Sequence, residues 1–261
     1  MSKQIPFRYD FVGSFLRPAN LKAAREGFEN GKISAYELKA VEDKEIERLI
    51  NKQKELGYHV ITDGEFRRAT WHLDFMWGFD GVAHEKTKTG LPFHGEDAMI
   101  DDTYLCGKVG LSKVHPFVEH FKFVKQFEDE NTVAKQTIPA PAQFIEQMIM
   151  PFALENTSKY YDSTHKLAED IANGYKKVIA DLYDAGCRNL QLDDCSWGML
   201  VDPRAEELFG TDKKGLKNIQ ELLVEINNLA IEDKPNDMTI TTHVCRGNFH
   251  STYASTGAYD S

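Results

Sequence analysis

The apolar positions of residues 42–56, 167–182 and 216–229 recur every three to four residues, which predicts three amphipathic helices. Each predicted helix leads into a short apolar strand: residues 58–65, residues 188–194, and the segment that contains His243 and Cys245. Gly57 and Gly186 follow the first two helices, and glycine readily adopts the left-handed conformation that ends a helix. A helix that feeds a strand whose C-terminal end turns polar is the pattern of parallel βα units.

Two further strands are predicted at residues 11–15 and 133–139, so the chain contains about five βα units. We therefore predict an α/β fold of the TIM (βα)8-barrel type, as a single domain over residues 1–261. The barrel is expected to be incomplete, since five units are fewer than the eight of this fold. A doubly wound sheet also has this rhythm, but the turn that begins at Gly13 lacks a G-x-G-x-x-G phosphate-binding pattern.

The pattern of βα units is interrupted between residues 70 and 130, where aromatic residues alternate with Gly, Asp and His. We interpret this stretch as an insertion after the second strand that lies over the barrel mouth. It is expected to contain a hairpin followed by a helix near residues 116–128. The alternative is that its aromatic residues form a satellite core.

Composition restricts the class of partner. The 261 residues are 41% hydrophobic and 28% charged, which is typical of a globular domain, and the net charge of −10 argues against a nucleic-acid partner. The N-terminus has no apolar signal-peptide core, and no apolar run approaches the length of about 18 residues that spans a membrane. A cytoplasmic location without membrane contact is expected, and the oligomeric state is left open.

Polar residues occur where the predicted strands end, and a barrel would bring these ends together. Each polar group alone has a simpler explanation, as a turn, a helix cap or a structural side chain. An imidazole and a thiolate are, however, good ligands for zinc, and the four cysteines are too few for a disulfide scaffold. Cys195 follows two acidic residues and could line the pocket, but nearby anions would keep its thiol protonated, so it is expected to be inert. The strand-end residues are Ser14, Glu65, Asp193, Asp194, His243 and Cys245.

An ordered set of motifs now carries a family resemblance along almost the whole chain. The motifs are Val12-Gly-Ser-Phe, Asp63-Gly-Glu-Phe-Arg-Arg, the proline-containing segment 133–144, Asp184-Ala-Gly-Cys-Arg-Asn-Leu-Gln-Leu-Asp-Asp and Thr242-His-Val-Cys. Together they resemble the cobalamin-independent methionine synthase family, in its C-terminal catalytic barrel and the short stand-alone relatives of that barrel.

The resemblance implies a zinc-dependent transfer of a methyl group from a methyltetrahydrofolate-type donor to the thiol of homocysteine, which makes methionine. By position, His243 and Cys245 match two zinc ligands. Ser14, Glu65 and Asp193 match positions that hold the amino-acid part of homocysteine. Two further assignments concern the methyl donor. Asp194 is a candidate proton donor to the leaving nitrogen, and Trp197 is either an aromatic wall for the folate or a packing residue.

The family pattern also supplies a Glu and a second Cys as zinc ligands, at positions beyond Ser261. We therefore expect a fragment or truncated form that binds zinc weakly and turns over slowly or not at all. A corrinoid-linked methyltransferase, or one acting on another thiol, is an alternative within the superfamily. A decarboxylase could use Arg17, Arg67 and Arg68 but leaves the His-Cys pair unexplained. An inactive barrel remnant or a simple amino-acid-binding module is the non-enzymatic alternative.

Overall fold

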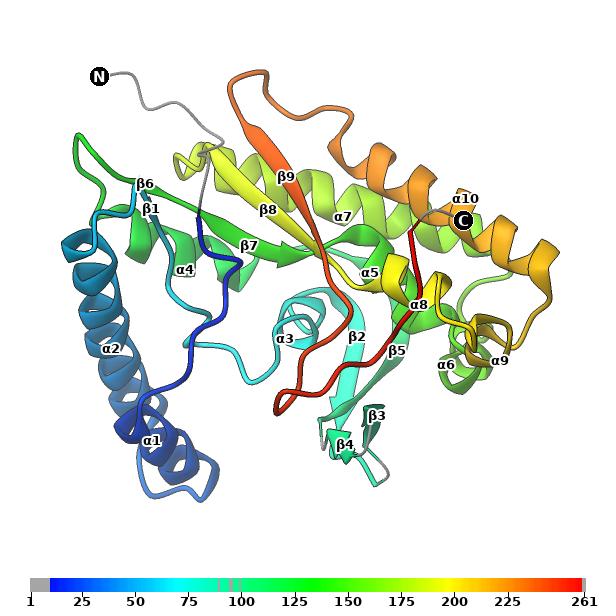
Figure 1. The fold of residues 1–261 in the computed structure, drawn as a ribbon, viewed down its shortest axis with the longest axis horizontal. Helices are drawn as coiled ribbons and strands as arrows, with labels where there is room; N and C mark the ends of the chain where they lie inside the picture. The colour runs from blue at the N-terminus through cyan, green and yellow to red at the C-terminus, as the bar shows by residue number, and fades with distance from the viewer. Residues whose placement is uncertain (1–9, 89, 94–95, 99, 260–261) are drawn as a thin grey trace.

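The computed structural model describes residues 10–88, 90–93, 96–98 and 100–259. Among these residues, helices and strands follow one another in the order shown in Figure 1. They are α1 (Ala19–Glu29), α2 (Ala35–Glu55), β1 (Val60–Ile61), α3 (Leu73–Met76), β2 (Asp80–Glu85), β3 (Leu91–Phe93), β4 (Glu96–Ala98), β5 (Asp102–Gly110), α4 (Pro116–Lys125), β6 (Val133–Ala134), β7 (Gln136–Pro139), α5 (Pro141–Ile149), α6 (Pro151–Thr157), α7 (Thr164–Asp184), β8 (Asn189–Asp194), α8 (Ser196–Leu200), α9 (Ala205–Phe209), α10 (Lys213–Ile231) and β9 (Thr239–Val244).

A parallel sheet forms the centre of the fold, with β8 between β7 and β9. A second parallel pair joins β1 to β6, the strand that immediately precedes β7. Parallel pairing brings the C-terminal ends of neighbouring strands to the same edge, as the sequence pattern predicted. The α/β class is thereby confirmed, while closure into a barrel stays a prediction.

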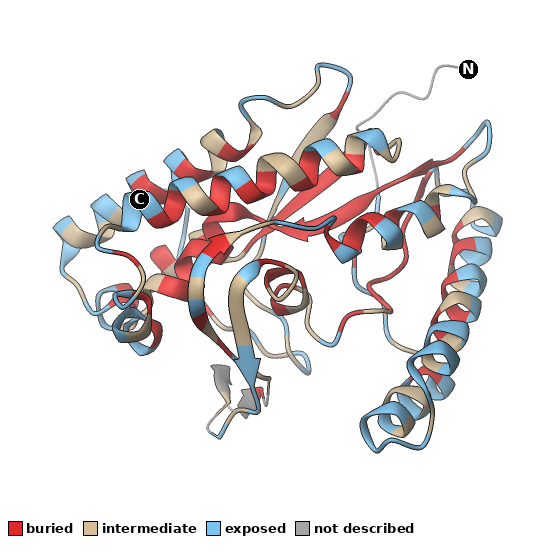
Figure 2. Ribbon diagram, turned by 180° about the vertical axis from the view of Figure 1, so that it is seen from behind, coloured by how far each residue is buried: buried red, intermediate tan, exposed pale blue. Residues whose placement is uncertain are grey.

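Helices α5, α7 and α10 pack against one another and cover one face of this sheet (Figure 1). The predicted apolar positions of residues 167–182 are all buried in α7. Figure 2 shows the consequence: β7 and β8 are buried, whereas β9 is partly exposed. The prediction for residues 42–56 was wrong at its end, because Leu56 is 62% exposed and lies just after α2.

The strand predicted at residues 11–15 is wrong, since the described residues of this segment, which include Phe11, form no strand. Side chains hold its backbone instead. The Gln191 amide donates to the Val12 carbonyl, and Lys135 donates to the carbonyl of Phe11. The Phe15 amide then donates to the Gly64 carbonyl at 3.0 Å. The segment therefore lies beside the sheet without extending its ladder.

Residues 70–130 contain both elements that were predicted for them. β2 and β5 form an antiparallel pair, β3 and β4 form a second one, and α4 follows. The aromatic side chains of Phe75, Phe79 and Phe117 are buried in the main hydrophobic core rather than in a satellite core. Phe79 meets Phe144 edge to face, with ring centroids 5.2 Å apart. These contacts tie the stretch firmly to the helices that cover the sheet.

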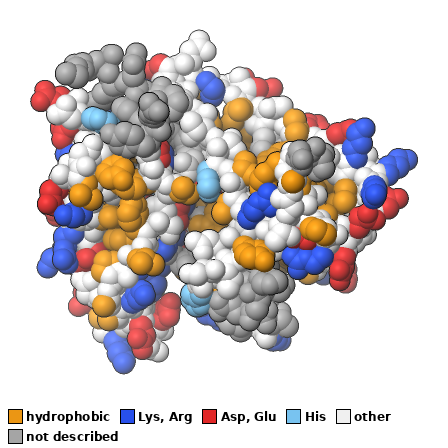
Figure 3. All heavy atoms as spheres, viewed as in Figure 1, with side chains coloured by type: hydrophobic (Ala, Val, Ile, Leu, Met, Phe, Trp, Pro, Cys, Tyr) orange, Lys and Arg blue, Asp and Glu red, His pale blue; other side chains and the backbone are white. Residues whose placement is uncertain are grey.

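Charged side chains of both signs are mixed at the two sides of the face in Figure 3, with hydrophobic side chains between them. The net charge of −10 is thus accompanied by many local pairs, such as Lys39 with Asp43. Exposed pairs of this kind contribute little to stability. Within the described part of the chain, no helix combines the length and apolarity needed to cross a membrane.

Two helical glycines test how tightly the core is packed. A Cβ at Gly174 in α7 would lie 2.4 Å from Phe79 Cε1, whereas one at Gly27 in α1 would meet only Ile33, at 3.7 Å. We expect Gly174→Ala to lower the free energy of unfolding by about 2 kcal/mol, because the ring has little room to move. Gly27→Ala should raise it by about 0.5 kcal/mol through helix propensity. Urea denaturation measures both, and an equal effect of the two substitutions would contradict this packing.

Candidate active site

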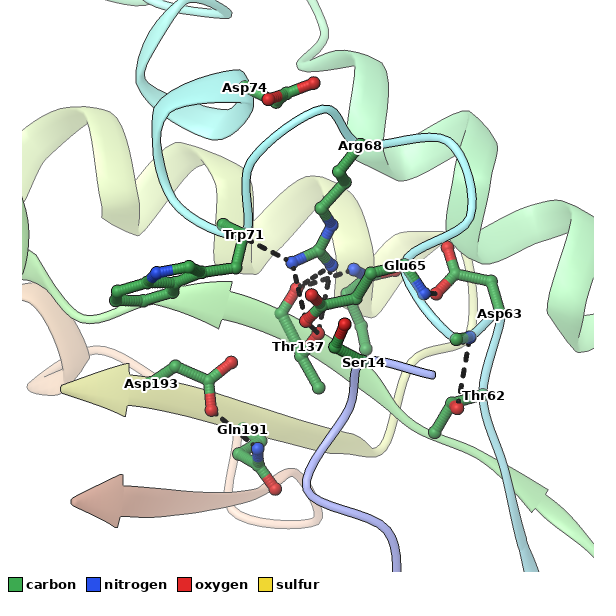
Figure 4. Close-up of polar contacts among 12 residues, drawn as sticks. Ser14, Thr62, Asp63, Glu65, Arg68, Trp71, Asp74, Thr137, Gln191 and Asp193 are labelled. Atoms are coloured by element: carbon green, nitrogen blue, oxygen red, sulfur yellow. Dashed lines mark hydrogen bonds and ion pairs between the residues drawn. The ribbon is translucent and has the colours of Figure 1, made fainter. Parts of the chain in front are cut away.

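The turn after β1 holds Glu65 in an unusual backbone conformation. Gly64 and Glu65 both have left-handed φ angles, +65° and +60°, and the Glu65 amide donates to Asp63 Oδ1 at 2.8 Å. A left-handed conformation costs a residue with a Cβ on the order of 1–3 kcal/mol. In this conformation the Glu65 side chain points toward β7 and β8, as Figure 4 shows. The strain therefore aims a carboxylate into the fold.

Arg68 and Thr137 hold one oxygen of the Glu65 carboxylate. The Arg68 side chain is 1% exposed and donates to Glu65 Oε1 at 3.1 Å and to the Thr137 carbonyl at 2.6 Å. Thr137 Oγ1 donates to the same Glu65 oxygen at 3.0 Å. The second carboxylate oxygen, Oε2, is buried and has no hydrogen-bond partner. One half of the carboxylate is thus fixed, and the other half is left to accept a hydrogen bond from a ligand.

The segment around Gly13 lies against this carboxylate. A Cβ at Gly13 would be 2.9 Å from Glu65 Oε1, so only glycine lets the backbone approach so closely. The next residue, Ser14, is exposed and accepts a hydrogen bond from Arg17 at 2.9 Å. Figure 4 shows Ser14 beside Glu65, and its role in holding an amino acid stays a prediction.

Asp193, at the end of β8, is the second buried acid. It is 7% exposed, and its Oδ1 accepts a hydrogen bond from Gln191 at 2.6 Å. Burial, together with the nearby negative charge of Glu65, raises the pKa of Asp193 to about 7. In Figure 4 the Trp71 ring extends over the same end of the sheet, next to Asp193. Two acids and an aromatic ring therefore face one region.

His243 lies directly across from Asp193 in the β8–β9 register. Cys245 comes just after β9, and both side chains are half-buried while Val244 between them is exposed. Contacts with Cys195 and with His243 lower the pKa of Cys245 to about 4, and the Cys245 contact raises the pKa of His243. These contacts favour the thiolate form of Cys245, which is the form that binds metals.

Asp194 is fully buried and points away from Asp193, since successive strand residues face opposite sides. It accepts hydrogen bonds from the Ser196 amide at 3.0 Å, Trp197 Nε1 at 2.8 Å and Asn227 Nδ2 at 3.2 Å. Burial raises its pKa. Asp194 thereby orients the Trp197 ring, and its role as a proton donor stays a prediction.

The sequence reasoning gave Arg68 and Gln191 no part in this site, and it named Cys195 only as an inert thiol that could line the pocket. Arg68 follows Glu65 by three residues, a spacing at which side chains in a turn can pair. Gln191 precedes Asp193 by two residues and so shares its face of the strand. Cys195 lies two residues after Asp193, just as Cys245 lies two residues after His243. This shared spacing was the signal in the sequence.

The donor set for a metal is partial. His243 and Cys245 fit a soft cation such as zinc, because an imidazole and a thiolate lie in contact at one strand end. Among the residues that the structure describes, however, no group of three or more His, Cys, Asp or Glu side chains is arranged to hold a metal. The chain thus offers two ligands where a stable zinc site has three or four.

The raised pKa of Asp193 makes a prediction about stability. In the folded protein the carboxyl keeps its proton up to about pH 7, whereas in the unfolded chain it loses the proton near pH 4. Its favourable contribution is therefore present at low pH and is lost as the pH rises between these values. We expect Asp193→Asn to raise the free energy of unfolding by about 2 kcal/mol at pH 8 and to change it little at pH 4. Denaturation at both pH values, with the exposed Asp162→Asn as control, measures this, and a loss of stability at pH 8 would contradict it.

Comparisons with known proteins agree on one family. The sequence profile "Cobalamin-independent synthase, Catalytic domain" matches residues 9–89. YxjH of Bacillus subtilis, an uncharacterised protein, is 39% identical over 259 residues, which are 99% of this chain and 66% of YxjH. A 5-methyltetrahydropteroyltriglutamate–homocysteine methyltransferase of Corynebacterium glutamicum is 24% identical over 95% of this chain and 31% of that enzyme.

Among solved structures, a Listeria monocytogenes protein provisionally named a vitamin-B12 independent methionine synthase superposes with a TM-score of 0.73. It is 40% identical, and the match covers 93% of this chain and 66% of that one. The chain thus spans just under two thirds of the length of YxjH and of the Listeria protein. Profile, sequence and structure agree that the chain belongs to the cobalamin-independent methionine synthase family.

Proposed function

We propose that this chain binds homocysteine at its strand ends and takes part in methyl transfer to the homocysteine thiol, with zinc at His243 and Cys245. The observation that carries the proposal is the pairing of Asp193 with His243 on adjacent strands. It puts an acid that can bind an ammonium beside donors that can bind a metal. Homocysteine has an ammonium at one end and a thiol at the other, so it matches both.

The amino end of the substrate is assigned to Glu65 and Asp193. Glu65 Oε2 is buried without a partner, and the pKa of Asp193 is raised partly by the charge of Glu65. A cation between two such carboxylates would relieve their repulsion and fill the missing hydrogen bond. The close backbone approach at Gly13 supports the binding of the substrate carboxylate at Gly13 and Ser14.

The sulfur end is assigned to His243 and Cys245. Zinc bound there would lower the pKa of a substrate thiol and so supply the thiolate that attacks the methyl group. The side chains themselves hold the donors in place. Asp193 faces the imidazole of His243 from the neighbouring strand, and the Gly247 amide donates to Cys245 Sγ at 3.3 Å. Such outer contacts orient metal ligands.

The methyl donor is assigned to a methyltetrahydrofolate-type molecule, with Trp197 as an aromatic surface for its ring system. Support for this assignment is that Asp194 fixes the Trp197 indole through its N–H group. The leaving nitrogen of such a donor needs a proton. Asp194 has a raised pKa but faces the helix-covered side of β8, where Asn227 donates to it, so the donor of this proton is left unassigned. We expect slow turnover by this chain, since it supplies two of the metal ligands.

Metal content tests the sulfur end. We expect zinc to copurify below one atom per chain and to fall severalfold further in Cys245→Ala, since that substitution removes one of two ligands. Cys106→Ala is the matched control, because Cys106 is an exposed cysteine on β5. Elemental analysis of the three purified proteins measures the difference. Equal zinc in the parent protein and in Cys245→Ala would overturn the metal assignment.

Ligand binding tests the amino end. We expect Asp193→Asn to weaken homocysteine binding about 10- to 100-fold, because a charged hydrogen bond to the ammonium is lost. The affinity for 4-mercaptobutanoate, which lacks the amine, should not change. Isothermal titration of both ligands distinguishes a lost ammonium contact from a damaged site. If Asp193→Asn weakens both ligands equally, or neither, the assignment of Asp193 is wrong.

A further inference from the structure

Cys195 and Cys245 follow the ends of the neighbouring strands β8 and β9. In the parallel ladder of β8 and β9, Asp194 pairs with Val244. The Cys245 amide donates to the Asp194 carbonyl at 3.3 Å, so the two chains are still bonded where the ladder ends. Cys195 and Cys245 immediately follow the two strands, and their side chains contact each other.

This placement meets the geometric requirement for a disulfide. Neighbouring strands lie about 4.8 Å apart, and cysteines joined by a disulfide have Cα atoms about 4.4–6.8 Å apart. The two side chains already interact with each other, and both cysteines are free. A Cβ at Gly198 would lie 2.7 Å from the Cys245 carbonyl oxygen, so the first turn of α8 is packed directly against the Cys245 backbone. Little backbone movement is needed to join the two sulfurs.

We propose that Cys195 and Cys245 are a modification site, at which hydrogen peroxide converts the two thiols of the metal-free protein into one disulfide. The sulfur of one cysteine attacks a peroxide oxygen, so that an S–O bond forms and the O–O bond breaks. The departing hydroxide takes the proton of this thiol and leaves as the first water. The sulfur of the other cysteine then attacks this oxidised sulfur. The S–S bond forms, the S–O bond breaks, and the departing hydroxide takes the second thiol proton as the second water.

The other two cysteines are poor competitors for this reaction. Cys187 is fully buried, and its Sγ donates to the Asn189 carbonyl. Cys106 is exposed but lies on β5, in the antiparallel pair that β5 forms with β2. Cys195 and Cys245 are half-buried, so a small oxidant can reach them. Formation of the disulfide does not depend on the proposed function, although it would consume the thiolate assigned there to the metal.

Peptide mapping tests the disulfide on the full chain. The protein is stripped of metal with EDTA, treated with one equivalent of hydrogen peroxide, blocked with N-ethylmaleimide and digested with trypsin without reductant. Each cysteine falls on its own tryptic peptide: residues 89–108, 178–188, 189–204 and 218–246. We expect a linked pair of 189–204 with 218–246, lighter than the two free peptides by two hydrogens and separated by dithiothreitol. Two of the four cysteines should therefore carry no N-ethylmaleimide.

Variants provide the controls. Cys106→Ala should give the same linked pair, whereas Cys195→Ser should give none and should leave Cys245 open to labelling by dimedone, a sulfenic-acid reagent. The inference is overturned if peptide 189–204 is recovered fully alkylated after oxidation of the parent protein. It is also overturned if the linked pair contains peptide 89–108 instead. Because the parent protein gives the decisive map, the result does not depend on whether a variant folds.

Discussion

The register of β8 between β7 and β9 is the constraint on which the candidate site depends. β8 is buried along its whole length, and the Ala140 amide donates to the Asp193 carbonyl while His243 lies across from the same residue. A shift of one residue would turn Asp193 to the helix-covered side and bring Asp194 into the site. The apolar contacts of β8 and its two ladders therefore decide which acid, which imidazole and which thiols meet.

The candidate site contains several features that lower the stability of the folded protein. Glu65 has a strained backbone and a buried oxygen without a partner, and Asp193 resists ionisation at neutral pH. Arg68 offsets part of the cost by pairing with Glu65 in the interior, where removal of either partner would leave a buried charge. Unfavourable features that gather at one place are typical of a binding site, since a ligand can relieve them.

Much of this arrangement could be predicted from the sequence, because helix periodicity and strand-end acids are local signals. The stripe of α7 and the strand β8 appeared where the pattern placed them. Residues 11–15 have the composition of a strand, but the contacts that decide their state come from Lys135 and Gln191, more than 100 residues away. The contacts of Arg68 and Cys195 could not be predicted for a related reason: they are made with Thr137 and Cys245, which are remote in sequence.

Protonation and ligand binding are coupled at this site. Burial raises the pKa of Asp193 and of Glu146, a second-turn residue of α5, to about 7 in each case. Glu146 also feels the charge of Asp194, so negative potential accumulates at the end of β8. An ammonium bound at Asp193 would displace its proton, and the proton and the amino acid therefore compete for the same carboxylate. A substrate with a positive charge would reduce the repulsion between the buried acids, whereas a neutral thiol would not. Under the proposed function, the acids would select the amino group and the His243–Cys245 pair would select the sulfur.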